Sequence, residues 1–211
     1  MTKNDDSDDS EETSEDLLTA SQNGDGVALE TLVVRHYPML RAYLRLNAGP
    51  AVRRRESVSD LAQSVCREVL RNADRFEYMG EAAFRAWLCE AALMKIKNKH
   101  AFHNADKRDA GREVEREDGV PNAHELAVIY GTSLGPEGNA IRAETIELIE
   151  AAVDRLPEDT RTIVSLRIAG NLSHREVAEH MGRSEAAVRQ AFGRAVAQLS
   201  VRLGPLLGER E

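Results

Sequence analysis

The stretch from Asn171 to Ala195, NLSHREVAEHMGRSEAAVRQAFGRA, constrains the fold more than any other part of the chain. Ser173 stands three residues before Glu176, which is the pattern of a capping box at the start of a helix. Gly182 can adopt the left-handed conformation that ends a helix, and Ser184 can cap the next one. Two short helices joined by a glycine-containing turn predict a helix-turn-helix.

The second helix of this motif carries the chemistry of a DNA reader on one face. At about 100° per residue its apolar side chains share a face, namely Val188, Ala191, Phe192, Ala195 and Leu199. The opposite face presents Ala186, Arg189, Gln190, Gly193 and Arg194. Arg and Gln bind guanine and adenine through paired hydrogen bonds, and small neighbours allow close approach to the groove. Packing of two helices in a core is the alternative, but we favour DNA reading.

The rest of the chain also predicts helices and no strands. Only 4% of the 211 residues are aromatic, while 42% are hydrophobic, which suits small helical bundles better than sandwiches of strands. Apolar residues recur every three to four positions over 27–46, 58–73 and from 81 past 100. We expect Pro38 to kink or divide the first of these helices, and a turn at 47–50.

Charge and composition divide the chain into four parts. Residues 1–20 hold eight acids against one lysine and are predicted to form a disordered tail. Residues 21–108 form one helical domain and 140–205 a second, joined by a flexible Gly-, Pro- and Asn-rich linker over 109–139, which holds one weak helical stretch. Both domains contain a basic region, which indicates two contacts with a polyanion.

Several function classes are not expected. No apolar run approaches the roughly 20 residues of a membrane span, and the acidic start is unlike a signal peptide, so we expect a cytoplasmic protein without membrane insertion. Cys66 and Cys89 lack a CxxC partner and are predicted to be reduced thiols. His100 and His103 lack a spaced set of further ligands, so no metal or cofactor is expected.

The first domain offers two candidate contact surfaces. The helix over 58–73 has a mixed polar face, which is either solvated or a protein contact, made of Asp60, Gln63, Ser64, Arg67 and Arg71. The following loop and helix interleave aromatic and basic side chains, namely Phe76, Tyr78, Lys95, Lys97, Asn98 and Lys99. Such interleaving suits single-stranded or melted DNA, whose bases can stack on rings.

Three segments together resemble the sigma-70 family of RNA polymerase specificity factors, of the extracytoplasmic-function (ECF) type. SDLAQSVCREVLRNADRF resembles the family's helix that binds the polymerase clamp, and GEAAFRAWLCEAAL resembles its following core helix. LPEDTRTIVSLRIAGNLSHREVAEHMGRSEAAVRQAFGRAVAQL resembles its C-terminal helix-turn-helix domain. The resemblance covers 27–108 and 144–203, and it implies an all-α, non-enzymatic factor that directs promoter recognition and transcription initiation.

The resemblance also implies residue roles and partners. Core RNA polymerase would contact Asp60, Gln63, Ser64 and Arg67. The minus-ten strand would contact Phe76, Tyr78, Lys95, Lys97, Asn98 and Lys99. The minus-thirty-five element would contact Arg183, Ser184, Ala186, Arg189, Gln190, Gly193 and Arg194. Many members of the family are also held by an anti-sigma factor, so such a regulator is a further expected partner.

The chain departs from the family pattern at three places, and two alternatives stay open. Ser64 stands where an acid is common, Leu93 and Met94 stand where Arg-Asn is common, and the acidic tail lies outside the pattern. One alternative is a stand-alone LuxR-like helix-turn-helix regulator that binds duplex DNA without polymerase. The other is an adaptor that binds polymerase without supporting initiation, which the departures at Leu93 and Met94 leave open.

Overall fold

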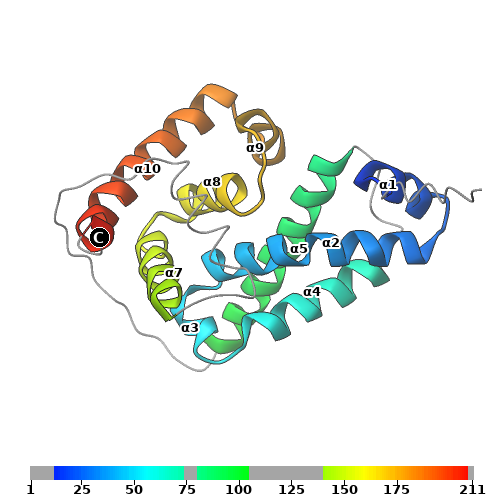
Figure 1. The fold of residues 1–211 in the computed structure, drawn as a ribbon, viewed down its shortest axis with the longest axis horizontal. Helices are drawn as coiled ribbons and strands as arrows, with labels where there is room; N and C mark the ends of the chain where they lie inside the picture. The colour runs from blue at the N-terminus through cyan, green and yellow to red at the C-terminus, as the bar shows by residue number, and fades with distance from the viewer. Residues whose placement is uncertain (1–11, 74–79, 105–139, 209–211) are drawn as a thin grey trace, which may run out of the picture.

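The computed structural model describes residues 12–73, 80–104 and 140–208, and in these ranges the regular structure is entirely helical. Figure 1 shows the helices as two groups in contact. The first group consists of α1 (Ser14–Gln22), α2 (Gly26–Asn47), α3 (Gly49–Arg53), α4 (Val58–Arg71) and α5 (Glu81–Asn104). The second consists of α7 (Ala140–Val153), α8 (Glu158–Ile168), α9 (His174–Met181) and α10 (Glu185–Gly208). We call these groups the N-terminal and C-terminal modules.

Helix α2 is the centre of the N-terminal module, because α1, α4 and α5 all pack on it. The positions of α2 that follow the helical period are all buried, namely Leu29, Leu32, Val33, His36, Leu40, Tyr43 and Leu44. The His36 ring contacts Phe84 of α5 edge-on at 5.4 Å, and its Nε2 lies 3.2 Å from Glu81 Oε1. A polar ring in the core is therefore satisfied by a carboxylate of a neighbouring helix.

For its described part, from residue 12 onward, helix α1 (Ser14–Gln22) corrects the expectation that residues 1–20 form a disordered tail. Thr13 and Asp16 form a complete capping box at its start. Leu17 and Leu18 are buried in the module's core, and Arg35 of α2 donates a hydrogen bond to the Glu12 carbonyl at 2.8 Å. Two leucines and a cap are enough to order this segment against α2, although it is rich in acids. Residues 1–11 lie outside the described residues.

The region from Pro38 to Pro50 also differs from expectation. Helix α2 runs unbroken through Pro38, which is exposed. Pro38 has no backbone N–H to donate to the carbonyl of Val34, four residues earlier. Val34 is 70% exposed, so water can bond to this carbonyl and the helix need not divide. The predicted turn at 47–50 is short: Gly49 adopts φ +65°, and α3 begins there with Pro50 in its first turn.

The C-terminal module confirms the predicted helix-turn-helix. Ser173 accepts a hydrogen bond from the Glu176 amide at 3.2 Å, and Glu176 accepts one from the Ser173 amide at 2.6 Å. Gly182 adopts φ +62° and ends α9, and Ser184 accepts a hydrogen bond from the Ala187 amide at the start of α10. The predicted core residues of α10 are buried, except that Ala191 is half-buried.

The two modules touch through α2, α3 and α5 on one side and α7, α8 and α9 on the other. Ion pairs join them, as does a hydrogen bond of 3.3 Å from Arg85 of α5 to the Asn171 carbonyl. Asn171 has φ +49°, a left-handed conformation that asparagine tolerates better than most residues. The predicted linker over 109–139, including its weak helical stretch, lies outside the described residues.

Candidate nucleic-acid interface

The face of α10 predicted to read DNA is open to solvent. The predicted residues there are all exposed, namely Arg183, Ser184, Ala186, Arg189, Gln190, Gly193 and Arg194. A shallow hollow at the start of the helix is lined by Glu185, Ala186, Arg189 and Gln190. The structure thus brings the predicted base-reading residues together on one accessible face. Their contact with DNA stays a prediction.

Two of these arginines are paired with carboxylates of their own chain. Arg183 bonds Asp159 at the start of α8, and Arg189 bonds Glu185 one turn earlier on α10. Exposed ion pairs contribute little to stability, because water competes for both charges. Either guanidinium can therefore exchange its carboxylate for a phosphate or a base edge at small cost.

A second layer of side chains supports α10 from behind, and the sequence analysis did not identify it. The Arg167 guanidinium lies 5.4 Å from the centroid of the Phe192 ring, and the His174 ring meets the same ring edge-on at 5.4 Å. Burial, and then the positive charges of Arg167 and Arg189, hold the pKa of His174 below its usual value. A neutral imidazole suits a position against an aromatic ring and beside two cations.

The polar face of α4 carries the predicted polymerase contacts. Asp60, Gln63 and Arg67 are exposed, and Ser64 is half-buried. Asp60 has a structural role as well, since its amide donates to Ser57 Oγ at 3.0 Å and its carboxylate accepts from the same hydroxyl at 2.8 Å. Ser57 is the cap of α4, so Asp60 also helps to start this helix.

An apolar groove runs beside these positions, between α2 and α4. Its volume is about 370 Å³, and its lining consists of Glu30, Val33, Val34, Tyr37, Gln63, Cys66, Arg67 and Leu70. Val34 in this groove is among the most exposed large hydrophobic side chains of the described residues. Exposed apolar surface next to polar side chains is typical of a protein contact.

The three predicted lysines of α5 are each paired with a carboxylate. Lys95 Nζ lies 3.5 Å from Glu68, Lys97 Nζ 3.6 Å from Glu158, and Lys99 Nζ 2.5 Å from Glu56. Only the second pair crosses between the modules. The pairing lowers the net charge of this face, a feature that the count of lysines in the sequence did not reveal.

The remaining predicted strand contacts are placed only in part. Asn98 is exposed on α5, whereas Phe76 and Tyr78 lie outside the described residues. Of the two departures from the family pattern, Leu93 is half-buried against the core and Met94 is 57% exposed. The structure thus leaves Met94, and not Leu93, on the surface near the lysines.

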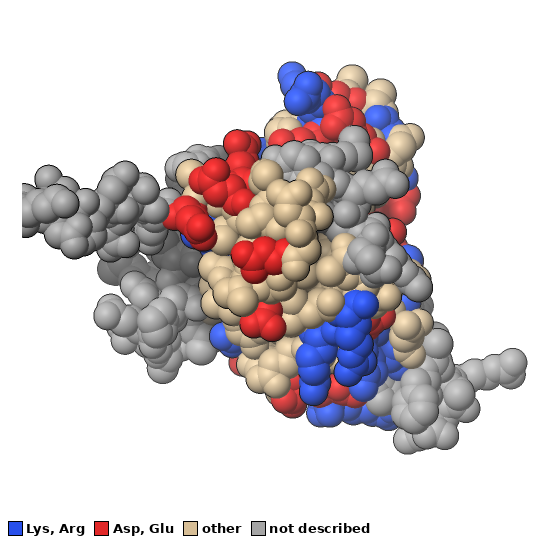
Figure 2. All heavy atoms as spheres, turned by 90° about the vertical axis from the view of Figure 1, so that its right-hand side faces the viewer, with Lys and Arg blue, Asp and Glu red and all other residues tan. Residues whose placement is uncertain are grey.

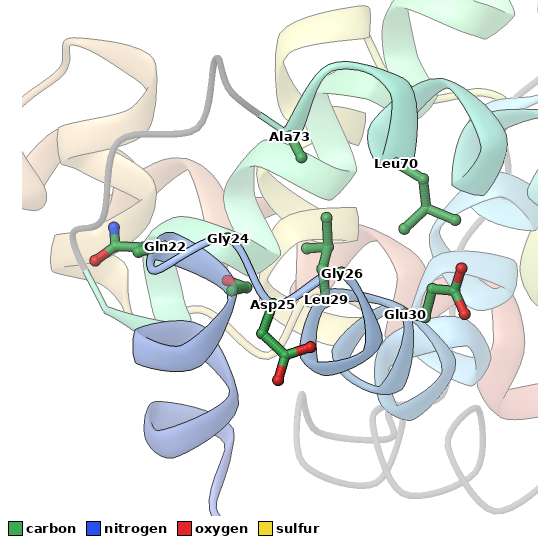
Figure 3. A pocket seen from close by; sticks show the side chains of 9 residues that line it. Gln22, Gly24, Asp25, Gly26, Leu29, Glu30, Leu70 and Ala73 are labelled. Carbon is green, nitrogen blue, oxygen red and sulfur yellow. The ribbon is translucent and has the colours of Figure 1, made fainter.

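A hollow of about 670 Å³ lies just past the end of α4, and one of its lining residues is Ala73, which stands three positions before Phe76 in the sequence. Figure 3 shows Leu70 of α4, and Ala73 two residues after that helix ends, facing Leu29 of α2 across it, with Asp25 and Glu30 near its rim. Figure 2 shows the side of the molecule that lies on the right in Figure 1, with a cluster of Lys and Arg in its lower part, Asp and Glu over its middle, and charges of both signs at its upper end. The lower part therefore attracts phosphate more strongly than the acidic middle does.

No helix among the described residues is long and apolar enough to cross a membrane.

Family models described as sigma-70 region 2 and sigma-70 region 4 match residues 32–103 and 146–199.

Curated relatives resemble most of the chain. The ECF RNA polymerase sigma factor SigD of Mycobacterium tuberculosis is 31% identical over 176 residues, covering 83% of this chain and 77% of the relative. ShbA of Streptomyces griseus, also an ECF RNA polymerase sigma factor, is 30% identical over 185 residues, covering 87% and 91%. Among solved structures, CnrH in complex with the cytosolic domain of CnrY shares the fold with a TM-score of 0.56 at 23% identity, covering 92% of this chain and 97% of CnrH.

Proposed function

The chain belongs to the ECF group of sigma-70 RNA polymerase sigma factors, and from this premise we propose how its two modules divide the work of promoter recognition. Residues 21–108, extended by α1, hold the polymerase clamp and the minus-ten strand. Residues 140–205 read the minus-thirty-five element, and 109–139 connect the two. The chain is not an enzyme: polymerase performs the chemistry in the cytoplasm, and this chain supplies placement and strand opening.

The observation that carries this proposal is the exposed face of α10. Arg189 and Gln190 stand on the first two turns of a capped helix, where a helix-turn-helix meets base edges. Ala186 and Gly193 leave room for the groove. Each module offers only a small set of DNA contacts and binds DNA weakly alone, so tethering both to polymerase provides the affinity.

The N-terminal module contributes the strand contacts. The lysines of α5 exchange their carboxylate partners for phosphates of the separated strand. The hollow at the end of α4 gives an unstacked base a place, since Leu29 and Leu70 offer apolar surface to a base. The acids at its rim exclude the phosphate backbone.

Protein partners meet a neighbouring surface of this module, since the groove between α2 and α4 shares Glu30 and Leu70 with the hollow. Asp60, Gln63 and Arg67 bind the polymerase clamp. CnrH was solved with the cytosolic domain of CnrY, and a comparable anti-sigma regulator would suit the groove between α2 and α4. Because Gln63 and Arg67 line that groove, such a regulator would compete directly with polymerase.

In vitro transcription tests the proposal. The purified protein is mixed with sigma-free polymerase of the same organism and genomic fragments, and transcript starts are mapped. Discrete starts that share two upstream motifs support it. Polymerase binding without starts would favour the adaptor, and sequence-specific DNA binding without polymerase would favour the stand-alone regulator.

A paired substitution then tests the residue roles. Arg189→Ala with Gln190→Ala removes two base readers, and each is expected to cost about 1–3 kcal/mol of discrimination, so initiation falls at least roughly tenfold. The control is Gln198→Ala, an exposed residue of the same type about 12 Å further along α10. Equal activity of both variants would reject base reading by α10.

A further inference from the structure

Glu185 is an acid at the start of the helix that we propose to enter the DNA groove. It is the first residue of α10, and it lines the hollow there together with Ala186, Arg189 and Gln190. Its Oε1 accepts a hydrogen bond from Arg189 Nη2, while the side chain of Glu185 is 42% exposed and that of Arg189 is 67% exposed. The two charged groups therefore meet on the surface, where a ligand can reach both of them.

Stability alone gives only a weak reason for an acid at this position. A carboxylate in the first turn suits the helix dipole, and an exposed pair with an arginine one turn later adds little more. On a face that binds DNA the same charge is unfavourable, because the phosphates repel it. Ala186 beside it carries only a methyl group, so a base edge can reach the carboxylate. Such a group favours DNA binding where it meets a hydrogen-bond donor of a base.

The major groove offers such donors on two of the four bases. Cytosine presents its N4 amino group and adenine its N6 amino group. Guanine presents two acceptors, O6 and N7, and is the base that an arginine binds best. In a G·C pair the cytosine amino group donates one hydrogen to guanine O6, so these two atoms lie about 2.9 Å apart. The second hydrogen of the amino group points into the groove.

The charged groups of Glu185 and Arg189 match this pair of base edges. They are in hydrogen-bond contact in the chain, as the two base edges are in the duplex. A guanidinium has five N–H donors, so Arg189 can bind guanine with two of them and stay bonded to Glu185. The bond to Arg189 uses Oε1 of the carboxylate, and Oε2 can accept from cytosine. An A·T pair fits less well, since thymine O4 offers the guanidinium one acceptor instead of two.

We propose that Glu185 is a specificity residue of the minus-thirty-five contact, and that Glu185 and Arg189 together read one G·C base pair. Arg189 binds the guanine, and Glu185 accepts a hydrogen bond from the amino group of the cytosine paired with it. This role rests on the proposed base reading by α10, and it adds the identity of one base pair of the promoter. It also assigns the strand of the guanine, because a C·G pair exchanges the positions of the donor and the acceptors.

Filter binding of the holoenzyme to a mapped promoter locates this base pair. Each minus-thirty-five base pair is exchanged in turn, and wild type is compared with Arg189→Ala. We expect one G·C position at which exchange weakens binding of wild type at least about fivefold, but leaves binding of Arg189→Ala almost unchanged. An A·T pair at the position that depends on Arg189 would overturn the proposal.

A cytosine analogue without the amino group, 2-pyrimidinone, then tests the contact of Glu185 itself. The proteins are wild type, Glu185→Ala and the control Glu179→Gln, an exposed acid of α9 that is paired with Arg175 at the same spacing. Weaker pairing of the analogue with guanine affects all three proteins equally and cancels in the comparison. Because a lost hydrogen bond to a charged group is costly, wild type and control should lose at least about fivefold more affinity than Glu185→Ala.

The outcomes separate this role from others. If Glu185 only orients Arg189, Glu185→Ala binds both DNAs more weakly but loses as much affinity as wild type on removal of the amino group, which would overturn the cytosine contact. Circular dichroism should show the wild-type helix content in each variant, since the substituted side chains are exposed. Discrimination that depends on Arg189 but not on Glu185 rejects this role alone. If wild type discriminates at no minus-thirty-five position, base reading by α10 fails together with it.

Discussion

Gly193→Ala is expected to change stability and DNA binding in opposite directions. Gly193 lies inside α10, and a Cβ added there meets no atom within 4 Å. Alanine is favoured over glycine in a helix interior by about 0.8–1.0 kcal/mol, so the C-terminal module should gain about that much free energy of unfolding. Nothing in the module opposes the gain, because the new methyl group points into solvent.

The same methyl group stands on the face that we propose to enter the groove. A helix held back by about 1.5 Å stretches hydrogen bonds of about 2.9 Å beyond the limit of about 3.5 Å, including those of Arg189 and Gln190. Each paired contact with a base contributes about 1–3 kcal/mol of discrimination. Binding of the holoenzyme to a mapped promoter should therefore fall at least about fivefold, although the protein itself is more stable.

Urea unfolding followed by circular dichroism measures the first effect, and filter binding of the holoenzyme to the promoter measures the second. Gly182→Ala is the contrasting control, since its added Cβ also meets nothing but its φ is +62°. That variant should lose about 1–2 kcal/mol, because the left-handed conformation is unfavourable for alanine. A Gly193→Ala variant that is more stable and binds the promoter as tightly as wild type would refute the close approach of α10.

Three further predictions concern local chemistry. Ser173→Ala removes the cap of α9 and should cost about 1 kcal/mol in urea unfolding, while Ser173→Thr should recover most of it; equal stability of both variants would contradict a capping role. Burial raises the pKa of Glu176, but its hydrogen bonds with Ser173 and the nearby arginines outweigh burial and leave the pKa below the usual value. A folded-state pKa below the unfolded one adds stability at pH values above the unfolded pKa, and this stability is lost as the pH falls through the folded pKa. The free energy of unfolding should therefore decrease between pH 6 and pH 3, and Glu176→Gln should reduce this decrease. Burial raises the pKa of both thiols, more for Cys89 than for Cys66, so iodoacetamide at pH 8 should modify Cys66 first, as mass spectrometry would show; faster labelling of Cys89 would contradict the packing of α5.

The helix-turn-helix was predictable because its signals are local. A capping serine, a glycine at the required position and a second serine each specify one turn of backbone, and the apolar spacing specifies which face packs. The same holds for α2 and α4, whose inward faces follow from helical periodicity. Local signals are read correctly from sequence when the physical cause and its effect lie within a few residues.

The errors and omissions have a different origin. The acid-rich composition before Ser14 led to the prediction of disorder, although Leu17 and Leu18 are buried. Their burial depends on α2 and α5, which lie further along the chain. Arg45 and Glu150 form an ion pair between the modules, but no local pattern joins them, because about a hundred residues separate them. The support of Phe192 by Arg167 and His174 likewise depends on how α8 and α9 fold back on α10. Contacts of this kind require a tertiary arrangement, which periodicity and capping do not specify.

The chemistry of the contact between the modules determines what separation would expose. The pairs described between them join charged side chains, and Arg85 bonds a backbone carbonyl. When such a contact parts, these arginines and carboxylates gain water. During synthesis the N-terminal module emerges before α7 exists, so Arg45 and Arg53 meet solvent before they meet their carboxylate partners on α7. The charged pairs of this contact therefore expose no apolar side chain of their own when the two modules exist apart, on the ribosome or on a promoter.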